Sequence, residues 1–90
     1  MLEINYEPKT GWSPPKILPY GKVRIHPAAT SLHYGLSCYN GMNILQNKDT
    51  KKTQAFRPFS HINEFFDSSN HLDLPLFDTQ ELFNSMKTLV

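Results

Sequence analysis

The side chains best suited to chemistry in this chain are one cysteine, four histidines and a few acids. Cys38 is the only thiol, and a nucleophilic cysteine needs an activating base or a positively charged surrounding. His33 lies five residues before Cys38, a separation that places the two on different faces of a helix. The pattern therefore favours a structural cysteine over a thiol nucleophile.

The histidines and acids do not show the spacing of a metal or hydrolytic site. The histidines, at positions 26, 33, 61 and 71, are separated by 7, 28 and 10 residues. None of these separations matches the i, i+4 pair that places two imidazoles together on a helix. We interpret them as polar or capping residues and predict no metal site. Glu64 and Asp67, three residues apart, could imitate a pair of hydrolytic acids, but the pattern favours a solvated helix face.

Charge and composition exclude several classes of function. The net charge is +1, and the densest lysine group, Lys48–Lys52, contains Asp49, so we predict no nucleic-acid partner. No apolar run reaches the roughly 20 residues of a membrane span. A single cysteine permits no internal disulfide and favours a reducing compartment. The first residues resemble neither a signal nor a transit peptide, so we expect a cytoplasmic or mitochondrial protein with no targeting segment in this chain.

The elements that must position these side chains are short and mixed in type. Alternation over Leu2–Tyr6 predicts a strand. Prolines and a glycine then crowd the chain up to Pro19 and predict an extended connection, within which Trp12 is expected to pack onto the body. We assign residues 1–22 to an extended N-terminal segment. Val23–Ile25 reads as a short strand, followed by a short helix over Pro27–Leu36 with proline at its first position.

The second half carries clearer patterns. Met42–Gln46 and Thr53–Phe56 predict a hairpin across a polar connection. Ser60–Leu72 predicts a helix, ended by Pro75, whose apolar face recurs at helical spacing. A last helix is expected from Asp78, with Glu81 completing an approximate capping box. Its apolar pattern is still running at Val90, so residues 23–90 are expected to be part of a truncated small domain.

Several strings in this order resemble the eukaryotic branched-chain amino acid aminotransferases, which are pyridoxal phosphate enzymes of fold type IV. The matching strings are Gly11-Trp12-x-Pro14-Pro15-x-Ile17-x-Pro19-Tyr20, His26-Pro27-Ala28-Ala29, Leu32-His33-Tyr34, Tyr39-Asn40-Gly41-Met42, Phe56-Arg57-Pro58 and Leu74-Pro75-x-Phe77-Asp78-x-x-Glu81-Leu82. The spacing between them also follows the family. Any one string alone is a weak signal, whereas their combination is specific.

The resemblance implies a small α+β domain with short antiparallel strands and two to three helices. In the family this domain and a larger one enclose the cofactor. Members move an amino group from leucine, isoleucine or valine to 2-oxoglutarate and form homodimers. The lysine that forms the Schiff base with the cofactor lies further along a full-length enzyme. The resemblance therefore implies no catalytic residue in this chain, and we expect no transamination by it alone.

Carried over residue by residue, the resemblance places Tyr34, Tyr39 and Gly41 in the wall of the substrate pocket. Tyr39 replaces the usual phenylalanine and adds a hydroxyl, which costs roughly 1–3 kcal/mol if it is buried without a partner. Asn40 and Asn43 stand where the family has a glutamate and a basic residue. Glu64 stands where an arginine holds the cofactor phosphate.

The exchange at position 64 opposes cofactor binding. Two like charges 4 Å apart repel by about 4 kcal/mol at an effective dielectric near 20, and the bidentate hydrogen bonds of an arginine are also lost. We therefore expect no binding of pyridoxal phosphate by this chain alone. Two alternatives to an enzyme segment remain open: an interaction module that uses exposed apolar surface, and a decayed copy without a role.

Overall fold

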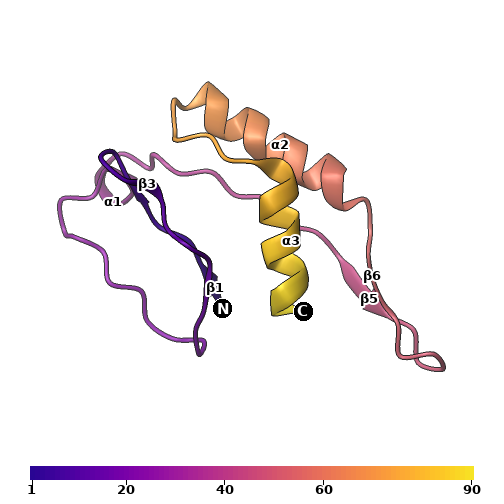
Figure 1. Cartoon of the computed structure of the whole chain (residues 1–90). Helices are drawn as coiled ribbons and strands as arrows, with labels where there is room; N and C mark the ends of the chain where they lie inside the picture. Colours follow the sequence, from indigo (N-terminus) through magenta and orange to yellow (C-terminus); the bar gives the residue numbers. More distant parts are fainter. The chain divides into compact units, whose positions relative to one another are not determined.

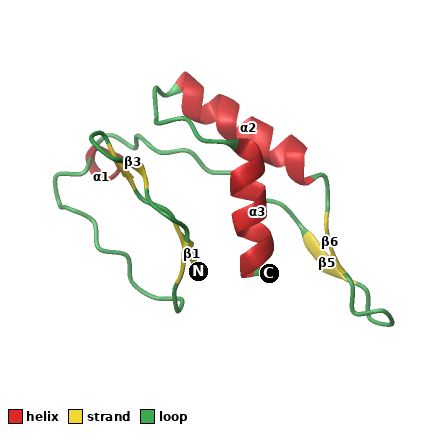
Figure 2. Cartoon of the chain, viewed as in Figure 1, coloured by secondary structure: helices red, strands yellow, loops and turns green.

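The computed structural model describes all 90 residues, and they group into two compact units. The first unit combines residues 1–36 with residues 80–90, and the second comprises residues 37–79. Three helices and short antiparallel strand pairs form the secondary structure, as Figures 1 and 2 show. The predicted α+β class with short antiparallel strands is therefore confirmed. None of the helices combines the length and the apolarity that crossing a membrane would require.

The first unit opens with a long, interrupted hairpin. Strands β1 (Leu2–Glu3) and β4 (Lys16–Ile17) pair at its open end, and β2 (Tyr6–Glu7) and β3 (Gly11–Trp12) pair next to the turn. Between the two pairs, the Ser13 N–H donates to the Asn5 carbonyl oxygen at 2.7 Å. The strand expected over Leu2–Tyr6 is thus two short strands, and the expected extended connection returns to pair with them.

Pro8 in the hairpin turn and Gly11 directly after it are two of the residues from which an extended connection was predicted. The Thr10 N–H donates to the Glu7 carbonyl oxygen at 3.2 Å, and Pro8 between them fixes its own φ for the turn. Gly11 follows with φ at 77°, a conformation that glycine adopts without steric cost. Across the strands, the Tyr6 and Trp12 rings meet edge to face with centroids 5.1 Å apart. Trp12 packs within its own hairpin and remains 42% exposed.

The segment after the hairpin contains less regular structure than expected. The strand predicted over Val23–Ile25 is wrong, since these residues lie in no strand. Val23 and Ile25 are 62% and 52% exposed, so no neighbouring strand or apolar surface covers their β-branched side chains. A β-branched run alone does not form a strand when nothing pairs with its backbone.

Helix α1 is only Thr30–His33, much shorter than the predicted Pro27–Leu36. Two histidine side chains bind backbone groups at the start of this segment, and one of these groups, the Pro27 carbonyl oxygen, is an acceptor that an earlier helix start would need. His26 Nδ1 accepts from the Ala28 N–H at 3.0 Å, and the His33 Nε2–H donates to the Pro27 carbonyl oxygen at 2.6 Å. Gly35, with φ at 63°, turns the chain away after the helix. Side-chain hydrogen bonds to nearby backbone thus compete successfully with the helix.

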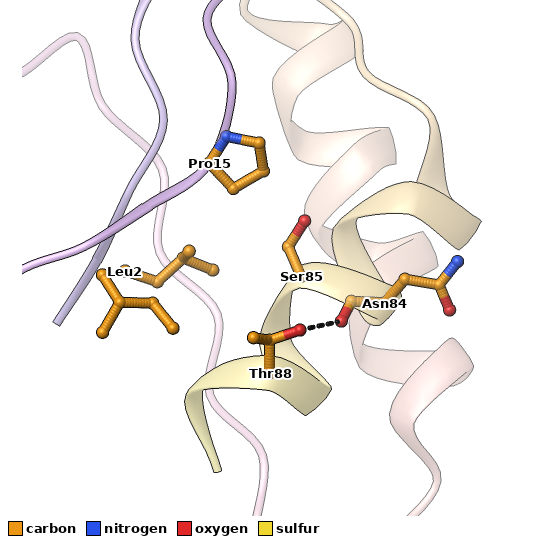
Figure 3. Close-up of a pocket in the computed structure, with 6 residues that line it drawn as sticks. Leu2, Pro15, Asn84, Ser85 and Thr88 are labelled. Carbon is orange, nitrogen blue, oxygen red and sulfur yellow. Dashed lines mark hydrogen bonds between the residues drawn. The ribbon is translucent and has the colours of Figure 1, made fainter.

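Helix α3 spans Thr79–Leu89 and begins directly after Asp78, as predicted. A shallow groove lies between this helix and the hairpin of the same unit. Its walls are Leu2, Pro15 and Ile17 from the hairpin and Asn84, Ser85 and Thr88 from α3, shown in Figure 3. The hydroxyls of Ser85 and Thr88 donate to the carbonyl oxygens of Glu81 and Asn84 within the helix, at 2.9 and 3.2 Å. These hydroxyls are therefore satisfied without a ligand.

The second unit contains the predicted hairpin, formed by β5 (Ile44–Gln46) and β6 (Thr53–Ala55) in antiparallel register. Asn47 organises the connection between these strands. Its Oδ1 accepts from the N–H groups of Asp49 and Thr50, at 2.8 and 3.1 Å. An asparagine side chain that binds the backbone two or three residues on mimics a backbone turn, which explains how a six-residue polar loop keeps the strands in register.

Helix α2 spans Pro58–His71 and carries the core of the second unit. Pro58 occupies the start of the helix, where its missing N–H costs nothing. Ile62 is 2% exposed and Ser69 is 3% exposed, on the same helix face. The rings of Phe65 and Phe66 both contact Phe77, with centroids 5.5 and 5.6 Å away. The segment after the helix thus folds back and covers the apolar face that the sequence pattern predicted.

The C-terminus of α2 is set by Asp73, not by the proline that follows. Asp73 has φ at 53°, and its N–H donates to the Asn70 carbonyl oxygen at 3.2 Å. The Leu74 N–H donates to the Ser69 carbonyl oxygen at 2.9 Å. Together these bonds form a Schellman motif, in which the left-handed position is usually glycine.

This geometry predicts that Asp73→Gly stabilises the chain. An L-residue in the left-handed region costs roughly 1–2 kcal/mol, and somewhat less for aspartate, so the free energy of unfolding should rise by about 1 kcal/mol. Asp67→Gly, the same exchange at an exposed position inside α2, should lower it by about 0.5–1 kcal/mol. Urea unfolding followed by helix circular dichroism measures both. Equal effects of the two substitutions would contradict the motif.

Candidate functional site

The residues predicted to contact substrate are divided between the two units. Tyr34 follows α1 in the first unit and is 85% exposed. Tyr39, Gly41 and Glu64 belong to the second unit, where they can be described together. The local site therefore consists of the segment Cys38–Gly41 and the face of α2 that this segment contacts.

Two hydrogen bonds tie this segment to α2. The Sγ of Cys38 lies 3.4 Å from the Oγ of Ser69, and the Asn40 Nδ2 donates to the Glu64 Oε2 at 3.2 Å. The two contacts on the helix are five residues apart, so the segment runs along the helix instead of touching it at one point. Tyr39 lies between the two residues that make these hydrogen bonds, Cys38 and Asn40.

The Cys38 thiol is the donor in its contact with Ser69. A serine hydroxyl has one hydrogen, and the Ser69 hydroxyl gives its hydrogen to the Phe65 carbonyl oxygen at 2.9 Å. The thiol hydrogen must therefore point to the Ser69 oxygen. The recorded hydrogen-bond partner of the sulfur is a hydroxyl and not a base, which agrees with a structural cysteine. In the sequence Ser69 lies at helical spacing from Ile62, Phe65 and Phe66, and a small hydroxyl on that apolar face is the sequence signal of a buried polar contact.

Tyr39 and Gly41 pack against one another. The phenolic oxygen of Tyr39 lies 3.0 Å from the position that a Cβ on Gly41 would occupy, so a larger residue would displace the ring. Tyr39 is nevertheless 89% exposed. Its hydroxyl is therefore open to water, and in this chain the additional oxygen carries no burial cost.

Glu64 presents a carboxylate where the resemblance implies a phosphate-binding cation. It is exposed on α2, and Asn40 donates to one of its oxygens. Arg57 is the only arginine in the second unit, and its guanidinium lies 5.9 Å from the centre of the Phe56 ring. Because the site is exposed, repulsion between a phosphate and Glu64 falls toward the roughly 1 kcal/mol expected in bulk water at 4 Å. The absence of a cation is then the larger obstacle to a phosphate.

The histidines and acids do not gather into a further site. No group of three or more His, Cys, Asp or Glu side chains lies close enough to hold a metal ion. His26 and His33 bind nearby backbone groups within the first unit, in agreement with their interpretation as polar or capping residues.

The chain is similar in sequence to known aminotransferases along its whole length, although no family model matches it. The relatives are branched-chain-amino-acid aminotransferases. The chain is 37% identical over 90 residues to the mitochondrial enzyme of Rattus norvegicus and 33% identical to the cytosolic enzyme of Mus musculus, and it covers 23% of each. It is 36% identical to a probable enzyme of Staphylococcus aureus and covers 25% of it. The chain thus spans about a quarter of the length of these relatives.

The Cys38–Ser69 contact predicts a selective effect of Ser69→Ala. Losing the acceptor leaves the thiol without its partner, so Cys38 should react faster with a thiol reagent, and stability should fall by about 1 kcal/mol. Ser68→Ala, one residue earlier on the exposed side of α2, should change neither. The rate of labelling by a disulfide reagent under native conditions tests this. A faster reaction in neither variant, or in both, would show that the contact does not restrain the thiol.

Proposed function

We propose that this chain forms part of the substrate-binding wall of a branched-chain aminotransferase-like protein and does not catalyse amino transfer by itself. Tyr34, Tyr39 and Gly41 are the residues assigned to that wall. The observation that supports this most directly is the similarity to branched-chain aminotransferases along all 90 residues. The exposure of Tyr34 and Tyr39, at 85% and 89%, leaves both rings available to a further part of such a protein.

The proposed absence of activity rests on the charge at the local site. Pyridoxal phosphate supplies the electron-withdrawing ring of transamination when it is bound, and its phosphate needs cations or several N–H donors. The second unit offers Glu64 at the relevant position, and the neighbouring amide of Asn40 is already donating to that carboxylate. These residues do not fit a phosphate group, so the chain's part in the reaction would be to shape the pocket for a branched side chain.

The wider context of the proposal comes from the relatives. The mitochondrial and cytosolic enzymes among them make both compartments reasonable for this chain. Branched-chain amino acids and their 2-oxo acids would be the substrates of the complete protein, and a homodimer would be its assembly.

A non-catalytic interaction module is the second candidate. A decayed copy without a role is a further alternative. The observation in favour of the module is the thin core, because Ile62 is the only buried hydrophobic side chain. A thin core leaves many large apolar side chains exposed, and exposed apolar surface favours association with a partner. Light scattering distinguishes the candidates: a stable complex with a full-length homologue favours the module, and a clean monomer opposes it.

The proposal predicts no amino transfer and no specific cofactor adduct for the isolated chain. Incubated with pyridoxal phosphate and then borohydride, it should show no saturable, stoichiometric adduct, and leucine with 2-oxoglutarate should give no glutamate. A full-length branched-chain aminotransferase treated in parallel provides the positive control. A saturable adduct together with turnover of leucine would overturn the proposed lack of activity.

A further inference from the structure

The dipeptide Asn40–Gly41 brings together the two groups needed for a reaction of the chain with itself. An asparagine side-chain amide can be attacked by the backbone nitrogen of the following residue. A side chain on that following residue hinders the approach, and glycine has none. The chain has seven asparagines, and Asn40 is the only one followed by glycine.

The structure leaves the attacking nitrogen free. The Gly41 N–H makes no hydrogen bond within the chain, and Gly41 is exposed. Asn47 provides a contrast: its side-chain oxygen accepts from two backbone N–H groups, at 2.8 and 3.1 Å, and Lys48 follows it. Asn47 is therefore held in its turn, whereas the backbone beside Asn40 is not.

We propose that Asn40 is a site of spontaneous deamidation and that its hydrogen bond to Glu64 slows this reaction. The inference does not depend on the proposed function, since it needs neither a cofactor nor another part of an enzyme. The 3.2 Å bond from Asn40 Nδ2 to Glu64 Oε2 restrains the side chain, and this restraint is the proposed obstacle to the approach of its carbonyl carbon to the Gly41 nitrogen.

The reaction balances with water as the only other reactant. The Gly41 nitrogen forms a bond to the Asn40 Cγ and gives up its proton to solvent, while Nδ2 takes one proton from solvent, its bond to Cγ breaks and it leaves as ammonia. Water then opens the five-membered imide at either carbonyl. The product is an aspartate or an isoaspartate at position 40, and nothing is oxidised or reduced.

Formation of the product would remove the hydrogen bond from Asn40 to Glu64, one of the two that connect the segment to α2. An ionised carboxylate has no hydrogen to donate, so a donor–acceptor pair becomes two like charges in contact. Of the two side-chain hydrogen bonds from the segment to α2, only the Cys38–Ser69 contact would remain. Deamidation would therefore loosen Tyr39 and Gly41, and an isoaspartate would also lengthen the backbone at the same point.

Peptide mapping by mass spectrometry tests the site during incubation of the full chain in mildly alkaline buffer. Asn40 should convert first, with Asn43 and Asn47 in the same chain as internal controls. Gly41→Ala should slow the conversion several-fold. Glu64→Ala should accelerate it about two- to tenfold, the factor that corresponds to the net free energy of one hydrogen bond. Conversion of Asn47 as fast as Asn40 would overturn the site, and an unchanged rate in folded Glu64→Ala would overturn the role of Glu64.

A second measurement follows the loosening directly. Asn40→Asp imitates one product, and Asn43→Asp adds the same charge nearby on a side chain that makes no hydrogen bond to Glu64. Labelling of the Cys38 thiol should be faster in Asn40→Asp than in Asn43→Asp or the native chain, with helix content unchanged. Equal labelling rates in the two variants would show that the new charge does not release the segment.

Discussion

The packing of neighbouring segments onto helix α2 is the constraint on which the second unit depends. Ile62 and Ser69 are its buried side chains, seven residues and thus about two helical turns apart. Phe77 closes over Phe65 and Phe66 from the segment that follows the helix. With so few buried groups, each contact on α2 carries a large share of the local stability. This holds for the polar contacts as well as for the apolar ones.

The polar contacts on α2 also determine what the site can bind. The segment that carries Tyr39 and Gly41 lies along the helix because Cys38 and Asn40 each find a partner on it. The arrangement of this segment on the helix therefore does not require a cation at position 64. In this chain the exposed group at position 64 is a carboxylate, which accepts hydrogen bonds and attracts cations. The proposed role in shaping a pocket is compatible with that charge, whereas a role in holding a phosphate is not.

Periodic patterns were sufficient to predict the second unit and insufficient for much of the first. Alternation and helical spacing located the β5–β6 hairpin and helix α2 of the second unit. Helix α3, most of which belongs to the first unit, begins after Asp78 as its capping pattern predicted. Pro8 and Gly11 suit a hairpin turn as well as an open connection, so sequence alone did not decide between them. The absence of a pairing partner for Val23–Ile25, and the 24-residue separation of Asn40 and Glu64, are properties of the folded chain that no local pattern contains.

The most direct test of the account is whether charge at position 64 controls phosphate binding. Titration of the isotope-labelled chain with pyridoxal phosphate, followed by nuclear magnetic resonance, should show no saturable change at Tyr39–Gly41 in the native protein. Glu64→Arg should produce one, and Asp67→Arg, with the same change in charge on an exposed position of α2, should not. Saturable binding of pyridoxal phosphate by the native chain at this segment, unaffected by Glu64→Arg, would contradict the account.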